Sequence, residues 1–278
     1  MSRIEQKFAA LKHEGRGALI PFLEAYDPDA ATSMAILHGM PGAGADLIEI
    51  GMPFTDPMAD GPTIQAAGRR GLLAGASLCR TLEMVREFRD EDDATPIVLM
   101  GYLNPILAYD PASFCRDAAM AGVDGLIVVD LPTEEAGLLS GHAAEHGLDI
   151  VRLVAPTTDD IRLPTVLQGC SGFVYYVSIT GVTGTRTASS AELAVAIPRI
   201  RAVTDLPIAV GFGVRTPAQA AAAVRVADGA VVASALIDTL AASLDAQGRA
   251  GPDTVRRVLD QVRTLADAVR AVGRPNTQ

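Results

Sequence analysis

The stretch LPIAVGFGVRTPAQAAAAVRVADGAVVASA, residues 206–235, contains one complete repeat of the pattern that predicts the fold. It begins with a short apolar run typical of a buried strand and passes through a glycine-containing turn into an alanine-rich segment with helical spacing at 217–226. A second apolar run follows. A strand, a connecting helix and another strand in this order indicate a parallel pair of strands.

The same alternation extends along the whole chain. Eight apolar runs begin at Ala18, Asp46, Pro96, Gly125, Asp149, Gly172, Leu206 and Gly229. Helices are expected at residues 29–38, 78–88, 111–121, 133–146, 191–203, 217–226 and 253–272. Eight buried parallel strands covered by helices favour closure into a barrel, because closure removes both sheet edges. We therefore predict an α/β fold, a (β/α)8 TIM barrel formed by residues 1–278 as a single domain.

An extra N-terminal helix is expected at about residues 4–13, where it would cover the barrel floor. A doubly wound open sheet is the alternative to the barrel. That fold would carry a glycine-rich dinucleotide fingerprint after its first strand, and the segment FLEAYDPD at 22–29 supplies none.

The composition disfavours several classes of partner. A formal net charge of −10 argues against nucleic acid and against an anionic membrane surface. The sequence shows no secretory leader pattern and no long apolar span, which favours a cytoplasmic location. The cysteines lack CxxC spacing, so we expect reduced thiols at Cys79, Cys115 and Cys170.

The distribution of lysine and histidine narrows the chemistry. The only lysines, Lys7 and Lys12, lie in the expected N-terminal helix, so no strand lysine can form a Schiff base with a carbonyl substrate. The four histidines also fall in expected helices, which disfavours metal-assisted enolisation; they are His13, His38, His142 and His146. We expect no metal and no cofactor, and we predict carboxylate acid/base chemistry on a phosphorylated substrate.

Acidic residues follow the second apolar run. Glu49 interrupts this run and points either into the barrel or toward the helices. Both places are costly for a charge, which favours a catalytic acid over a structural ion pair with Arg152. Asp56 and Asp60 lie on the proline-containing loop that comes next. Asp56 suits a turn-forming role, whereas Asp60 suits either a turn or the site.

Small residues follow the last three strands. Gly181, Gly184, Gly211 and Gly213 would let backbone N–H groups approach an anion, and Ser234 is expected to cap the start of a helix. Because these loops converge on one rim of a barrel, they predict a phosphate site.

The sequence closely resembles the tryptophan synthase alpha chain family. The matching motifs are IEIGMPFTDPMADGPTIQ from Ile48, GYLNPI from Gly101, GVDGLIVVDLP from Gly122, YYVSITGVTG from Tyr175 and VGFGVRTPAQ from Val210. The resemblance implies a lyase that cleaves indole-3-glycerol phosphate to indole and glyceraldehyde 3-phosphate in tryptophan biosynthesis. It also implies a beta chain as partner in an alpha2-beta2 tetramer, with mobile lids at residues 53–60 and 179–190.

The resemblance implies a catalytic pair, Glu49 and Asp60. The expected substrate-binding residues are Phe22, Met100, Tyr102, Ile127, Val129, Leu153, Tyr175, Thr183 and Phe212. The expected phosphate-binding residues are Gly184, Gly213, Ala233 and Ser234. Two residues stand where the family usually has glycine. Tyr26 is expected to affect the mouth of the site, and Ala233 is expected to crowd the phosphate by one methyl group.

Three other functions stay open at this point. The first is a stand-alone lyase that releases free indole without a beta chain. The second is a regulatory subunit without catalysis, which the presence of Glu49 and Asp60 disfavours. The third is a sugar-phosphate isomerase or epimerase on the same barrel, which would be inactive toward the indole substrate.

Overall fold

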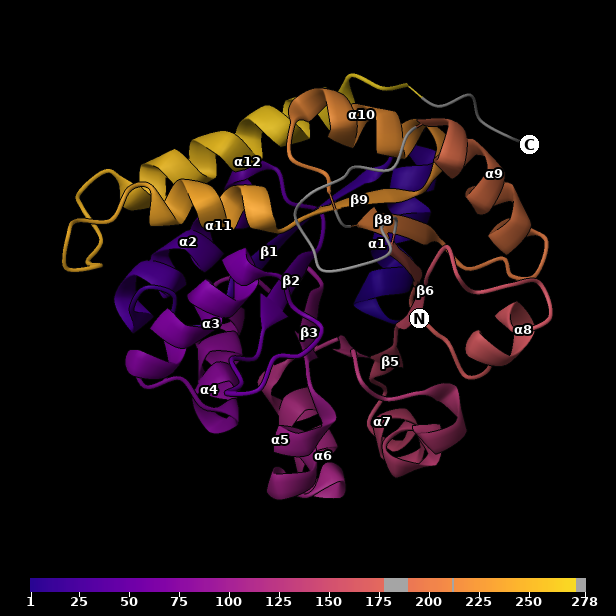
Figure 1. Ribbon diagram of the computed structural model, residues 1–278, viewed down its shortest axis with the longest axis horizontal. Helices are drawn as coiled ribbons and strands as arrows, with labels where there is room; N and C mark the ends of the chain where they lie inside the picture. The colour runs from indigo at the N-terminus through magenta and orange to yellow at the C-terminus, as the bar shows by residue number, and fades with distance from the viewer. Residues whose placement is uncertain (178–189, 212, 274–278) are drawn as a thin grey trace.

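Parallel strands in this chain form one continuous sheet that curves into a barrel with helices around it (Figure 1). The computed structural model describes residues 1–177, 190–211 and 213–273. Within these residues the sheet has nine strands in the order β5-β4-β3-β2-β1-β9-β8-β7-β6. The strands are β1 Ala18–Glu24, β2 Ile48–Gly51, β3 Ile97–Gly101, β4 Gly125–Val128, β5 Asp149–Ile150, β6 Arg152–Val154, β7 Val174–Val177, β8 Ile208–Gly211 and β9 Gly229–Val232.

The two end strands of this order, β5 and β6, are separated in the chain by Val151 alone. The Val151 N–H donates to the Leu126 carbonyl of β4 at 3.0 Å, while β6 pairs with β7 on the other side. The run expected as one strand from Asp149 is therefore two short strands that join opposite ends of the sheet. The predicted (β/α)8 TIM barrel is confirmed.

Helices surround the sheet in the expected alternation. They are α1 Arg3–His13, α2 Ala30–Ala43, α3 Pro62–Leu73, α4 Leu78–Arg89, α5 Leu103–Tyr109, α6 Pro111–Ala121, η1 Thr133–Leu138, α7 Ser140–Glu145, α8 Leu163–Val166, α9 Ser190–Arg201, α10 Pro217–Val226, α11 Ser234–Ala241 and α12 Thr254–Arg270. Two of these, α6 and α10, have the predicted bounds. Three short or glycine-containing helices, α3, α5 and α8, were not predicted, whereas α11 lies where the start of a helix was expected at Ser234.

The helix expected at 133–146 is wrong as a single element. The segment forms a 3-10 helix, η1, and a short α-helix, α7, with a non-helical Leu139 between them. Gly137 and Gly141 lie in these two pieces, and glycine lowers helix stability by about 1 kcal/mol relative to alanine. The break is consistent with that cost.

The N-terminal helix α1 covers the barrel floor, as predicted. Its apolar face contributes Ile4, Phe8 and Leu11 to the cluster that fills the barrel interior, and the Phe8 and Phe173 rings lie 5.8 Å apart. Ser2 starts α1 with a capping box. Because α1 covers the amino ends of the strands, the carboxyl ends are left as the open rim.

None of the described helices has the length and apolar character that crossing a bilayer requires. Cys79, Cys115 and Cys170 are all free thiols, as expected. A single domain over residues 1–278 and a cytoplasmic location stay predictions.

Candidate active site

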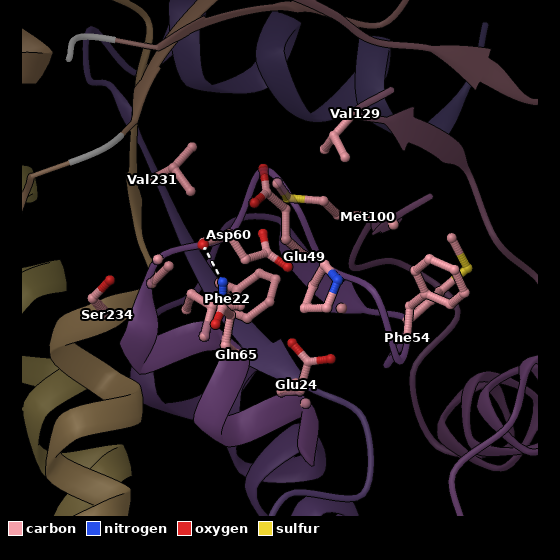
Figure 2. Close-up of a pocket in the computed structure, with 18 of the residues that line it drawn as sticks. Phe22, Glu24, Glu49, Phe54, Asp60, Gln65, Met100, Val129, Val231 and Ser234 are labelled. Carbon is pink, nitrogen blue, oxygen red and sulfur yellow. Dashed lines mark hydrogen bonds between the residues drawn. The ribbon is translucent and has the colours of Figure 1, made fainter. Parts of the chain in front are cut away.

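A cavity of about 220 Å³ lies at the carboxyl ends of the strands (Figure 2). Its lining comes from the ends of β1, β2, β3 and β9 and from the loops that follow β2 and β8. Ten of the residues expected in the site line it together: Phe22, Glu49, Asp60, Met100, Tyr102, Val129, Tyr175, Gly213, Ala233 and Ser234.

Glu49 faces the barrel interior. Its strand neighbours Ile48 and Ile50 pack in the outer core beneath the helices, so the alternation of side chains along β2 directs Glu49 inward. The side chain is 1% exposed, and burial raises its pKa from 4.5 to about 8. Within the described part of the chain, its Oε1 has no hydrogen-bond partner. Glu49 is therefore mostly an uncharged acid at neutral pH.

The alternative ion pair between Glu49 and Arg152 is not formed. Arg152 lies on β6 between the inward-facing Val151 and Leu153 and so points away from the interior cluster. Its Nη1 donates to the Leu131 carbonyl at 3.3 Å. A structural counter-ion therefore does not account for Glu49.

Asp60 is positioned by the loop end and by the start of α3. Its backbone carbonyl accepts a hydrogen bond from Gln65 Nε2 at 2.9 Å, and Gly61 is the N-cap of α3. The Tyr102 hydroxyl accepts from the Ala59 N–H at 3.0 Å and also hydrogen-bonds the Asp60 carboxylate. Burial raises the pKa of Asp60 to about 6, and the Tyr102 hydrogen bond opposes that rise. Asp60 is therefore mostly charged at neutral pH.

Tyr175 lies on the cavity lining beside Glu49. It is 3% exposed, and burial raises the pKa of its hydroxyl well above the ordinary value, with a further contribution from the charge of Glu49. A Cβ atom at Gly211 would overlap the Tyr175 hydroxyl. The end of β8 therefore needs glycine to admit this ring.

Two of the apolar residues predicted to contact the substrate are not part of the lining. Phe22, Met100 and Val129 line the cavity, whereas Ile127 and Leu153 pack in the barrel-interior cluster and are absent from the lining. Met100 pairs with Ile127 in the sheet register, so both lie at the same level of the barrel. Contact of Ile127 and Leu153 with a ligand stays a prediction.

Three of the residues expected to bind phosphate lie together on the cavity lining. Gly213 has a φ of 82°, a left-handed conformation that favours glycine, and it lies on the lining with Ala233 and Ser234. The prediction that Ser234 caps the start of a helix is wrong. It is the first residue of α11, Ala233 is the N-cap, and no side chain caps this end. Residues 178–189 and 212 lie outside the described part of the chain. They include four residues expected in the site: Gly181, Thr183, Gly184 and Phe212.

Tyr26 does not lie at the mouth of the cavity. Its φ of 66° explains why glycine suits this position, and its N–H donates to Ser33 Oγ at 3.1 Å. The ring packs against the outer core beneath the helices. The expected place of Tyr26 at the mouth of the site is therefore wrong, because Tyr26 is absent from the cavity lining and packs with the residues beneath the helices.

The sequence analysis missed one acid in the cavity. Glu24 is the last residue of β1, is 4% exposed and lies on the lining. The period of two from Phe22, which faces the cavity, would have indicated its direction. Other lining residues that were missed include Gly51, Phe54, Gln65 and Arg215. Among the described residues, no group of His, Cys, Asp and Glu is arranged to hold a metal ion.

Comparisons with known proteins agree with this geometry. The sequence model of the family described as "Tryptophan synthase alpha chain" matches residues 8–270. The tryptophan synthase alpha chain of Gluconacetobacter diazotrophicus is 74% identical over 270 residues, which cover 97% of this chain and 98% of that protein. The alpha chain of Granulibacter bethesdensis is 70% identical over 271 residues, covering 98% and 97% of the two chains.

Solved structures show the same likeness. The tryptophan synthase subunit alpha from Legionella pneumophila str. Paris superposes with a TM-score of 0.89 at 36% identity, covering 98% of this chain and all of that one (100%). A chain of Mycobacterium tuberculosis tryptophan synthase gives a TM-score of 0.86 at 37% identity, covering 97% and 98% of the two chains.

Proposed function

This chain belongs to the tryptophan synthase alpha chain family, and on that premise we propose that Glu49 and Asp60 carry out its reaction as a neutral acid and a charged carboxylate. The chain is a carbon–carbon lyase of tryptophan biosynthesis that cleaves indole-3-glycerol phosphate to indole and glyceraldehyde 3-phosphate. The bond that breaks joins carbon 3 of the indole ring to the glycerol chain.

Glu49 moves the proton. As an uncharged acid it protonates carbon 3 of the ring, which makes the ring a cation. The resulting carboxylate then removes the proton from the hydroxyl on the adjacent glycerol carbon. The electron pair left on that oxygen forms the carbonyl of the aldehyde. The electrons of the broken carbon–carbon bond return to the ring. One proton has moved from the hydroxyl to the ring, and Glu49 is again an acid.

Asp60 stabilises the cation. The positive charge of the protonated ring is shared with the indole nitrogen, whose N–H can donate to the Asp60 carboxylate. This hydrogen bond strengthens as charge develops, so it lowers the barrier rather than only binding substrate. Tyr102 keeps the carboxylate in place through its hydrogen bond.

The opposite rim binds the phosphate. The uncapped N-terminus of α11 presents backbone N–H groups and the Ser234 hydroxyl, and the positive φ of Gly213 lets the backbone approach closely. The Ala233 methyl group lines the same cavity. Gly184 and Thr183 are proposed to complete this subsite.

A single observation carries the proposal. Two carboxyls in one cavity, the buried Glu49 and the half-buried Asp60, have pKa values of about 8 and about 6, so at neutral pH one is an acid and the other a base. The test is indole release from indole-3-glycerol phosphate by the purified chain. Glu49→Gln should abolish it, and Asp60→Asn should lower kcat/KM by about 100-fold or more. Unchanged activity in either variant would contradict these roles.

A beta chain is the proposed partner, in an alpha2-beta2 tetramer. The loop at 53–60 that carries Asp60 also carries Met58, which is 81% exposed and would be covered by a docked chain. Docking on this loop would act on Asp60 directly. Indole release should therefore rise when a beta chain is added. Full activity of the isolated chain, unaffected by a beta chain, would instead support a stand-alone lyase.

A further inference from the structure

Glu24 is a buried carboxyl without a partner in the substrate cavity. It is 4% exposed and lies on the same lining as Glu49 and Asp60. Within the part of the chain that the structure describes, no hydrogen bond or ion pair engages its carboxyl oxygens. Its oxygens are not among the fully enclosed unsatisfied atoms of the described residues, so they border the open space of the cavity and need a new partner once substrate displaces water from it.

The place of Glu24 is tightly defined. It pairs in register with Gly51 on β2, and a Cβ atom at Gly51 would overlap its carboxyl. On the other side, its Oε1 lies 3.6 Å from where a Cβ of Gly68 on α3 would be. The side chain is therefore confined between β2 and α3, the two elements that the Asp60 loop connects. Figure 2 shows the carboxyls of Glu24, Asp60 and Glu49 around one space.

The charged groups that face Glu24 favour its neutral form. Burial raises its pKa well above the ordinary value, and the charges of Asp60 and then Asp27 raise it further. Arg70 opposes this, but its guanidinium is engaged by Asp27, with distances of 2.6 Å from Nε and 2.8 Å from Nη2 to the two carboxylate oxygens. The direction of this shift favours a protonated Glu24 on the same cavity lining as the Asp60 carboxylate, so the two groups suit a donor and an acceptor.

We propose that Glu24 is a positioning residue for Asp60: when substrate displaces water from the cavity, the Glu24 carboxyl donates a hydrogen bond to the Asp60 carboxylate. This proposal rests on the role of Asp60 in the proposed function. The two carboxyls then share one proton, as closely placed acids do in low-dielectric sites. The hydrogen bond keeps Asp60 charged in the closed site and directs its other oxygen at the indole N–H.

The test compares Glu24→Met with Glu24→Gln in the full-length chain, assayed with a beta chain. Methionine removes the donor while filling the space, and glutamine keeps an N–H donor in the same shape. The measurement is kcat for indole release as a function of pH, because the pH profile of kcat reports the pKa values of groups in the substrate complex, where the proposed hydrogen bond forms. In Glu24→Met, the acid limb set by Asp60 should move up by about one to two pH units, because a hydrogen bond to a charged group is lost. In Glu24→Gln it should move by less than about half a unit.

This shift has a signature that a structural defect lacks. If the acid limb lies near pH 6 in wild type, Glu24→Met should lose kcat by about 3- to 25-fold near pH 6.5, and near pH 8.5 the two proteins should agree within about two-fold. Thermal melting of both variants at each pH would show whether the fold is retained. A pH-independent loss in the folded methionine variant, or an unmoved acid limb, would overturn the proposal.

A second measurement separates this proposal from the proposed function. Binding of an indole-3-propyl phosphate, which lacks the hydroxyl needed for cleavage, is followed by calorimetry against pH. In wild type its affinity should fall below about pH 6 as Asp60 is protonated, and in Glu24→Met the fall should be about 10-fold smaller, because the bound state then holds the Asp60 charge less strongly. Absence of indole release by wild type would refute the lyase mechanism. Identical binding profiles would refute the pairing of Glu24 with Asp60.

Discussion

Replacement of Glu49 by glutamine should abolish catalysis and stabilise the protein at alkaline pH. The amide has the shape of the acid but cannot ionise or transfer a proton. In the folded chain, burial raises the pKa of Glu49 from 4.5 to about 8. Between these values the folded state binds one proton more than the unfolded state, so the free energy of unfolding falls as pH rises.

The magnitude follows from the same two values. The destabilisation by Glu49 is absent below pH 4.5, grows by about 1.4 kcal/mol per pH unit and levels off above about pH 8. The full difference corresponds to about 5 kcal/mol, and glutamine removes it because it stays neutral. For a chain of this size, 1 kcal/mol shifts the melting temperature by about 2 °C. Glu49→Gln should therefore melt about 10 °C above wild type near pH 8.5, with a small difference near pH 5.

The assay is thermal or urea unfolding of both proteins at the two pH values, together with indole release. Glu83→Gln on α4 provides a control, because Glu83 is exposed and the same chemical change is made outside the cavity. Equal melting differences at the two pH values would refute the buried neutral state of Glu49. Retained indole release by the glutamine variant would refute its role as the proton donor.

Three further changes test the site and the fold. Gly51→Ala should lower kcat/KM by about 10-fold or more, since its methyl group would overlap the Glu24 carboxyl. The matched control is Gly137→Ala, which should be neutral because a Cβ at Gly137 meets nothing within 4 Å. Ser234→Ala should raise KM about 5-fold by loss of one hydrogen bond to phosphate, and a loss in kcat alone would contradict that contact. Asp124→Asn should lower the free energy of unfolding by about 3 kcal/mol in urea, because Asp124 accepts from two arginines and one backbone N–H. Its indole release should be unchanged.

The barrel could be predicted because buried parallel strands leave a strong signal. Strands covered on both sides read as continuous apolar runs, and each run recurs after a helix-length segment. The same continuous apolar run leaves the direction of the Glu49 side chain undetermined from the sequence. Since Leu47, Ile48 and Ile50 are all apolar, alternation alone does not distinguish the interior from the helix layer. Only the packed structure shows that Ile48 and Ile50 contact the outer core.

The features that the sequence did not predict, helix α3 and the direction of Glu24, depend on close contacts rather than on hydrophobic periodicity. Helix α3 contains Gly68 and Gly71, which weaken its helical pattern, yet a Cβ at Gly71 would lie 2.5 Å from the Ala25 carbonyl. These glycines let α3 approach the end of β1. In the sequence, Glu24 resembles the start of a loop because an acid usually ends an apolar strand. Its direction becomes clear only once Phe22 is known to face the cavity.

The position of each carboxyl in the fold, and not the type of residue, decides which one is charged. Desolvation acts on all three acids of the cavity, because Glu24 and Glu49 are buried and Asp60 is half-buried. Only Asp60 lies beside a helix N-terminus and receives a hydrogen bond from Tyr102, so it ionises first. Its charge then makes ionisation of Glu24 harder, while Glu49 is held neutral by burial alone. At neutral pH, Asp60 is thus mostly a carboxylate and Glu49 mostly an acid, while the pKa of Glu24 is raised well above its ordinary value. The reaction needs a charge opposite the indole nitrogen and a proton opposite carbon 3, and this order of ionisation provides both.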